Sequence, residues 1–112
     1  MGKKDDLIAK YHAEMDELNI NYDAKLFEKV VTGCGPSIYN ADAATVSGSD
    51  PSELTTVKNN FLIRKLGLDE SHDLDGAIAS TINILGKSNR NKYRAIFYYL
   101  LMVHFKKESV YA

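Results

Sequence analysis

The feature that most restricts the fold of this chain is an apolar run near its C-terminus. From Ala95 to Phe105 the sequence reads AIFYYLLMVHF, and His104 is its only polar residue. A helix that is apolar on all sides must be buried over most of its surface. We therefore expect a helix from about Ser88 to Lys107, which is either the central helix of the domain or part of an oligomer interface.

The rest of the chain predicts four further helices. Its apolar residues recur every three or four positions, and no segment alternates with the period of two that marks a strand. The predicted helices cover residues 4–18, 23–33, 50–67 and about 71–86. The sequence thus predicts an all-α fold, with one compact domain over residues 1–112, about five helices and a mostly buried C-terminal helix.

Helix boundaries are marked by capping residues. Asp23 and Asp50 are typical N-caps, and Pro51 suits the first helical position after Asp50. Glu53 follows Asp50 by three residues, as in a capping box. Gly33 is expected to end the second helix, since glycine readily adopts the left-handed conformation found there.

The connection from Gly33 to Pro51, GCGPSIYNADAATVSGSDP, contains three of the seven glycines, both prolines and the only cysteine. Long irregular connections inside a compact domain are usually functional or disordered. Pro36 is suited to open one helical turn through Tyr39, and residues 41–45 are suited to form another. We expect this connection to lie over the last helix.

The polar middle of this connection allows two interpretations. Tyr39, Asn40 and Asp42 are candidate ligand-contacting residues. Alternatively, Asn40 and Asp42 cap short helical turns, while Ile38, Tyr39 and Val46 pack inward as anchors.

Cys34 is the only cysteine, so the chain has no internal disulfide, and a reducing compartment is the simplest expectation. A thiol beside a helix start can have a lowered pKa, but catalysis also needs a positioned base. The three histidines show no spacing that places one near Cys34, and none pairs with another residue as metal ligands do. We expect a small packed residue here, with no catalytic residue, metal or cofactor.

Basic residues gather before the apolar run, in GKSNRNKYR. Lys87, Arg90, Lys92 and Arg94 are placed at the start of the last predicted helix, where positive charge opposes the helix dipole. The acids of residues 69–75 sit at the start of the preceding helix, roughly 18 Å away in a hairpin at 1.5 Å per residue. The four basic residues are therefore candidates for binding an anion or an acidic partner, although a solvated or internally paired face explains them as well.

Overall charge sets further limits. Residues 1–86 carry 8 basic and 14 acidic residues and residues 87–112 carry 6 and 1, so the net charge of −1 conceals an acidic and a basic part. That balance, with no helix-turn-helix pattern, argues against nucleic acid as a ligand. With no apolar run of membrane-spanning length and no signal-peptide core, we expect a cytoplasmic protein.

Three segments together resemble a family of small uncharacterised bacterial proteins filed as a domain of unknown function. They are GPSIYNADAATVSGSD at 35–50, VKNNFLIRKLGL at 57–68 and GKSNRNKYRAIFYYLL at 86–101. The resemblance implies a bacterial cytoplasmic protein of about this length. It implies no activity, substrate or catalytic residue. The joint occurrence of the first and third segments suggests that they meet in space.

These observations favour a non-enzymatic binding or interaction protein, which self-associates or docks an acidic partner through the basic start of the last helix. The alternative is a small enzyme or small-ligand sensor, with its site between the 33–50 connection and Arg90, Lys92 and Arg94. A site of that kind needs a pocket with a buried, perturbed titratable group. A docking protein needs an exposed charged or apolar patch instead.

Overall fold

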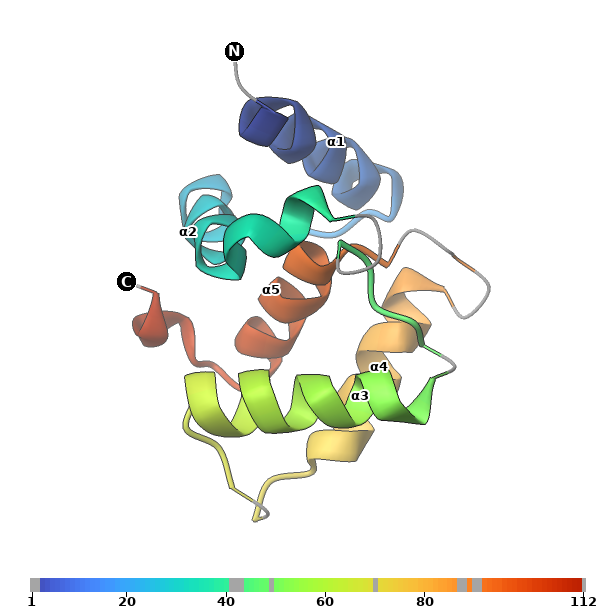
Figure 1. Ribbon diagram of the computed structural model, residues 1–112, viewed down its shortest axis with the longest axis vertical. Coiled ribbons are helices and arrows are strands. Elements are labelled where there is room, and N and C mark those ends of the chain that lie inside the picture. The colour runs from blue at the N-terminus through green and yellow to red at the C-terminus, as the bar shows by residue number, and fades with distance from the viewer. Residues whose placement is uncertain are drawn as a thin grey trace.

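The structure, a computed structural model, describes residues 3–40, 44–48, 50–69, 71–86, 89 and 92–111. Over these residues the fold is all-α, as predicted (Figure 1). Its helices are α1 (Lys3–Glu17), α2 (Ala24–Cys34), α3 (Pro51–Thr56), α4 (Leu74–Leu85) and α5 (Arg94–His104), with the 3₁₀ segments η1 (Gly35–Tyr39) and η3 (Glu108–Val110) and the π-helical η2 (Val57–Lys65).

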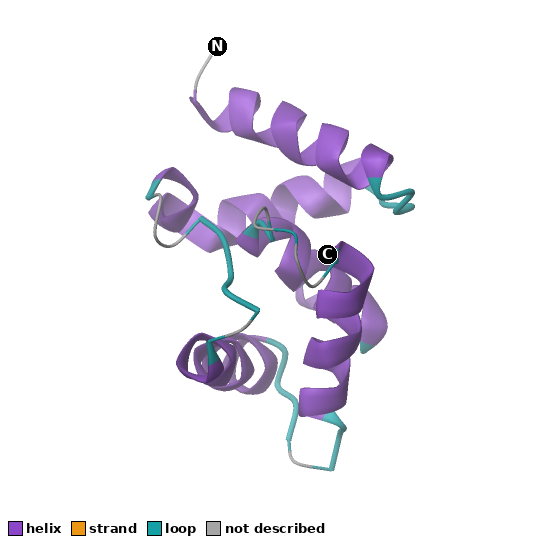
Figure 2. Ribbon diagram, turned by 90° about the vertical axis from the view of Figure 1, so that its right-hand side faces the viewer, coloured by secondary structure: helices purple, strands orange, loops and turns teal. Residues whose placement is uncertain are grey.

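Helix α5 is central, as the apolar run requires. It packs against α1, α2 and α4, and six of its residues are buried: Ala95, Ile96, Phe97, Tyr99, Leu101 and Met102. In Figure 1, α5 runs through the middle of the molecule between α2 and α4. Figure 2 shows the helices from the side, with α1 lying across the end opposite the α3–η2 segment.

Helix α5 is shorter than the predicted span from Ser88 to Lys107. It begins only at Arg94, because Tyr93 is extended and faces Thr45 in an antiparallel bridge. It ends at His104, and Lys106 has a left-handed φ of 56°. Of the four basic residues predicted at the helix start, Arg94 is therefore the first helical residue and Lys92 precedes the helix, whereas Lys87 and Arg90 lie outside the described residues.

The predicted caps are largely confirmed. The Asp23 carboxylate accepts hydrogen bonds from the backbone N–H groups of Lys25 and Leu26, and Asp50 accepts one from Ser52. The expected end of α2 at Gly33 was wrong, because the helix continues to Cys34. The residue with positive φ is Gly35, at 64°, two positions later.

The π-helical winding of η2 was not predicted, since α-helical spacing was assumed through residue 66. Val57, Phe61, Leu62 and Leu66 are all buried, and each lies four or five residues from two of the others. At the α-helical rotation of about 100° per residue, Leu66 would point away from Val57. Hydrogen bonds from residue i to i+5 widen each turn, so the π-helical winding turns these side chains toward the same core.

One hydrophobic core unites the described residues, and aromatic rings form much of it. Tyr11 and Phe27 meet edge to face with centroids 6.0 Å apart, and Phe27 meets Tyr99 in the same way at 5.6 Å. The Tyr99 hydroxyl accepts a hydrogen bond from the Asp23 N–H at 2.8 Å. The buried Tyr11 hydroxyl, in contrast, has no hydrogen-bond partner among the described residues.

Candidate functional site

The connection after α2 and the segment before α5 meet through their backbones, as the sequence suggested. The Val46 N–H donates to the Lys92 carbonyl at 2.7 Å, and the Arg94 N–H donates to the Ala44 carbonyl at 2.8 Å. This short pairing fixes residues 44–46 beside the start of α5. It brings together two of the segments from which candidate site residues were drawn.

Lys92, one of the predicted anion-binding residues, lies in the interior. Its side chain is buried and its Nζ donates to the Asn89 carbonyl at 2.6 Å. Gly48 lies against its stem, since a Cβ atom at Gly48 would be 3.2 Å from Lys92 Cε. The lysine side chain thus packs against the 44–48 segment, while its ammonium group binds a carbonyl of its own segment.

Arg94 joins α5 to α3. Its guanidinium donates to Glu53 Oε1 at 2.6 Å and to the Tyr98 hydroxyl at 2.7 Å. Although burial opposes the charge of Arg94, Tyr98 and Glu53 raise its pKa above the ordinary value. The Asp50 N–H donates to the Ser47 carbonyl at 3.4 Å instead of to Glu53, so the predicted capping box is not formed. The Tyr98 ring in turn stacks on Phe61, with centroids 4.0 Å apart.

The remaining predicted residues are scattered. Tyr39 is half exposed rather than packed inward as an anchor, whereas Ile38 and Val46 are buried as expected. The 3₁₀ segment η1 ends at Tyr39, which fits the helical turn predicted after Pro36, and Asn40 is exposed. Asp42, Lys87 and Arg90 lie outside the described residues. Anion binding by this set of residues stays a prediction.

Cys34 ends α2 and faces the interior. Burial raises the pKa of its thiol to about 11, although the nearby Arg94 acts in the opposite direction. An activated thiol needs the reverse shift. The structure thus favours the packed cysteine of the two sequence interpretations.

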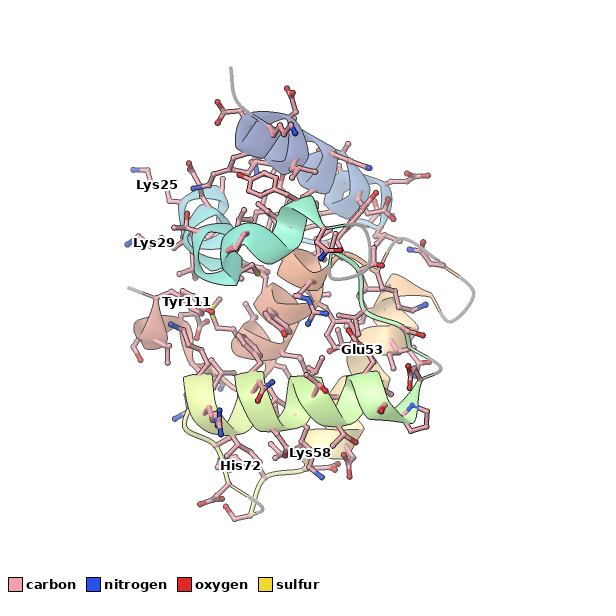
Figure 3. All side chains as sticks on the ribbon, viewed as in Figure 1. Lys25, Lys29, Glu53, Lys58, His72 and Tyr111 are labelled. Atoms are coloured by element: carbon pink, nitrogen blue, oxygen red, sulfur yellow. The ribbon has the colours of Figure 1, made fainter. Side chains whose placement is uncertain are left out.

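A groove that sequence reasoning missed runs along the outer face of α2. It has a volume of about 570 Å³ and is lined by Lys25, Glu28, Lys29, Thr32, Val110 and Tyr111. Figure 3 shows Lys25 and Lys29 projecting outward from α2, with Tyr111 beside the end of that helix. Among the described residues neither lysine forms an ion pair, so both ammonium groups face solvent at the rim of the groove.

The groove exists because the C-terminal segment returns to α2. Tyr111 lies so close to Gly33 that a Cβ atom there would be 2.9 Å from its Cε1. Lys65 Nζ lies over this ring, 5.0 Å from the ring centroid. Considered on α2 alone, the polar face is typical of a solvated helix surface; it carries Lys25, Lys29 and Thr32. No pattern in the sequence predicted that Tyr111 would pack against this face of α2.

The sequence matches, over residues 10–109, a family described as a protein of unknown function (DUF2853). The chain belongs to this family. The match confirms the resemblance to a domain of unknown function. No curated protein matches the sequence.

Membership in this family assigns no reaction to the chain. Among the residues that the structure describes, no group of three or more His, Cys, Asp or Glu side chains could hold a metal ion. In the same part of the chain, no helix has the length and apolar character needed to cross a membrane.

Proposed function

We propose that this chain is a non-enzymatic binding protein that holds an acidic segment of a partner protein in the groove along α2. The observation that carries the proposal is the combination of charge and shape in that groove. Lys25 and Lys29 stand at its rim, and Val110 and Tyr111 supply an apolar wall. The sequence already favoured an acidic partner, and the structure supports a different place for it.

Charge around the groove is predominantly positive. Lys25 and Lys29 line it, and Lys4 Nζ donates to Thr32 Oγ1 at 2.7 Å, while Glu28 is the one acid among the described residues of its lining. Lysines that lack an internal ion pair keep their capacity to meet a carboxylate. A mixed basic and apolar groove of this kind suits a peptide with acidic residues.

The interior polar groups support binding rather than catalysis. Arg94 is neutralised by Glu53, Lys92 donates to a backbone carbonyl, and the pKa of the Cys34 thiol is raised by burial. A catalytic nucleophile or base needs its reactive form to be accessible near neutral pH. These three groups serve the fold instead.

The test is fluorescence anisotropy with a labelled acidic peptide, EEDFDEE, titrated with the purified protein at low and high salt. The variant Lys25→Ala/Lys29→Ala should weaken binding about fivefold, since each exposed ion pair contributes about 0.2–1 kcal/mol. Binding to the unmodified protein should also weaken as salt rises.

Two matched variants remove the same charge elsewhere. Lys3→Ala/Arg64→Ala alters exposed residues that do not line the groove, and binding should be unchanged. Lys87→Ala/Arg90→Ala tests the basic segment that the sequence favoured. A greater loss in that variant than in Lys25→Ala/Lys29→Ala would return the site to the segment before α5. Binding that is equally weak in every variant would reject the proposal.

A further inference from the structure

A second hollow lies next to the groove, on the other side of Tyr111. Its volume is about 160 Å³, and it is lined by Gly33, Asn60, Phe61, Lys65, Tyr98 and Tyr111. Tyr111 lines both hollows, so its ring is their common wall. A ligand that lies in the groove along α2 is therefore beside this second hollow.

The described residues that line the second hollow include three aromatic side chains and one lysine. The Phe61 and Tyr98 rings are stacked with an interplanar angle of 9°, and the Tyr111 ring stands against the bare backbone of Gly33. Lys65 Nζ lies over the Tyr111 ring at 5.0 Å from its centroid. Aromatic rings pack well against one another, and an ammonium group attracts the face of a ring.

The size of the hollow suits one ring. A protein cavity of about 150 Å³ accommodates a benzene molecule, and the volume here is about 160 Å³. The π-helical winding of η2 contributes to its shape, because residues five apart lie about one turn apart. Asn60 and Lys65 therefore both reach the same hollow.

We infer that this second hollow is an aromatic subsite of the groove, which receives a Phe or Tyr side chain from the acidic segment of the partner. The inference rests on the proposed function and adds to it the kind of residue that is recognised. Carboxylates on one side of the aromatic residue meet Lys25 and Lys29. Those on the other side meet Lys65, so the lysines flank the aromatic site at both ends.

The experiment compares two labelled peptides, EEDFDEE and EEDADEE, which differ only at the central residue. The unmodified protein should bind the Phe peptide about tenfold more tightly, as expected for burial of one aromatic side chain. The variant Asn60→Phe should fill the hollow and abolish this preference, while its affinity for the Ala peptide should stay the same.

The neighbouring Asn59 provides the matched control. It is exposed and does not line the hollow, so Asn59→Phe should retain the tenfold preference. Circular dichroism and thermal unfolding of both variants will show whether the fold is kept. If Asn60→Phe unfolds the chain, the smaller substitution Asn60→Leu provides the second test, and it should reduce the preference for the Phe peptide while leaving the affinity for the Ala peptide unchanged.

The two proposals fail in different ways. Equal binding of both peptides, still weakened by Lys25→Ala/Lys29→Ala, would overturn the aromatic subsite and leave the acidic groove. No binding of either peptide would overturn both. Sedimentation of the protein alone provides a further check, because a dimer that Asn60→Phe dissociates would mean that a second copy of this chain occupies the hollow, against the inference.

Discussion

A Cβ atom at Gly33 would lie 2.9 Å from Cε1 of Tyr111. The Tyr111 ring therefore packs on bare helix backbone in the last turn of α2, and this contact brings the C-terminal segment to that helix. Burial raises the pKa of Tyr111 to about 12. The groove and the hollow beside it share this ring, so the Gly33–Tyr111 contact shapes both.

The substitution Gly33→Ala should displace the Tyr111 ring. Alanine in a helix interior stabilises by about 0.5–1 kcal/mol relative to glycine, which offsets the lost contact, so the free energy of unfolding should change little. The pKa of Tyr111 should fall toward its ordinary value of 10.0 as the ring becomes exposed. Tyrosine ring NMR across a pH titration measures this. In the control variant Thr32→Ala, one residue earlier and exposed, the pKa of Tyr111 should stay high.

Arg94→Met should destabilise the fold by about 2 kcal/mol, because it removes hydrogen bonds from a charged donor to Glu53 and Tyr98. Urea unfolding measures the loss. Adding Glu53→Gln to the Arg94→Met background should cost less than Glu53→Gln alone, which a double-mutant cycle will show. The pair of Lys58 and Asp75, 3.4 Å apart and with an exposed carboxylate, is the comparison. Lys58→Met should cost less than about 1 kcal/mol, and equal costs at both sites would contradict the structural role of Arg94.

Tyr11→Phe should stabilise the protein by about 1 kcal/mol, because it removes a buried hydroxyl that has no partner among the described residues. The pKa of Tyr11 is raised, chiefly by burial, from 10.0 to about 12. The folded state thus holds this proton more firmly than the unfolded chain, so the stability present below pH 10 is lost as the pH rises toward 12.

In Tyr11→Phe this alkaline loss should be smaller, although Tyr111 and Cys34, whose pKa values are also raised, will retain part of it. Urea unfolding at pH 9 and at pH 11.5 measures both effects. Lower stability of Tyr11→Phe at pH 9 would show that the hydroxyl does have a partner.

Cys34 should react slowly with a disulfide reagent. Burial raises the pKa of its thiol from 9.0 to about 11, so the thiolate fraction at pH 8 should be about 100-fold lower than in the unfolded chain. Stopped-flow measurements of the native protein and of the urea-unfolded chain provide the comparison. A native rate equal to or above the unfolded rate would indicate an activated thiol and favour the enzyme hypothesis.

Local signals predicted helices better than they predicted their ends. Asp23 and Asp50 cap the helices as expected, because a side-chain acceptor and the next backbone donors lie within a few residues. Glu53 had the right spacing for a capping box, yet it binds Arg94, which is 41 residues away. A rule based on local spacing could not predict that the guanidinium of Arg94 would bind this carboxylate.

The start of α5 shows the same limit. The last helix was predicted to begin near Ser88, but Tyr93 is extended opposite Thr45, and the backbones of Lys92 and Arg94 pair with residues 44–46. Long-range backbone hydrogen bonds replaced the helical ones there. Two predicted anion-binding residues, Lys92 and Arg94, consequently entered internal contacts that their charge alone did not suggest.

The sequence by itself determined that this chain is all-α and that the run from Ala95 to Phe105 is central, because an apolar surface of that extent must leave water. Only the tertiary structure decided where exposed lysines border a groove. Lys25 and Lys29 became the rim of a groove once Tyr111 packed on Gly33. The burial of a helix follows from its apolar composition and helical periodicity. A groove, in contrast, depends on which surfaces from distant parts of the sequence pack together.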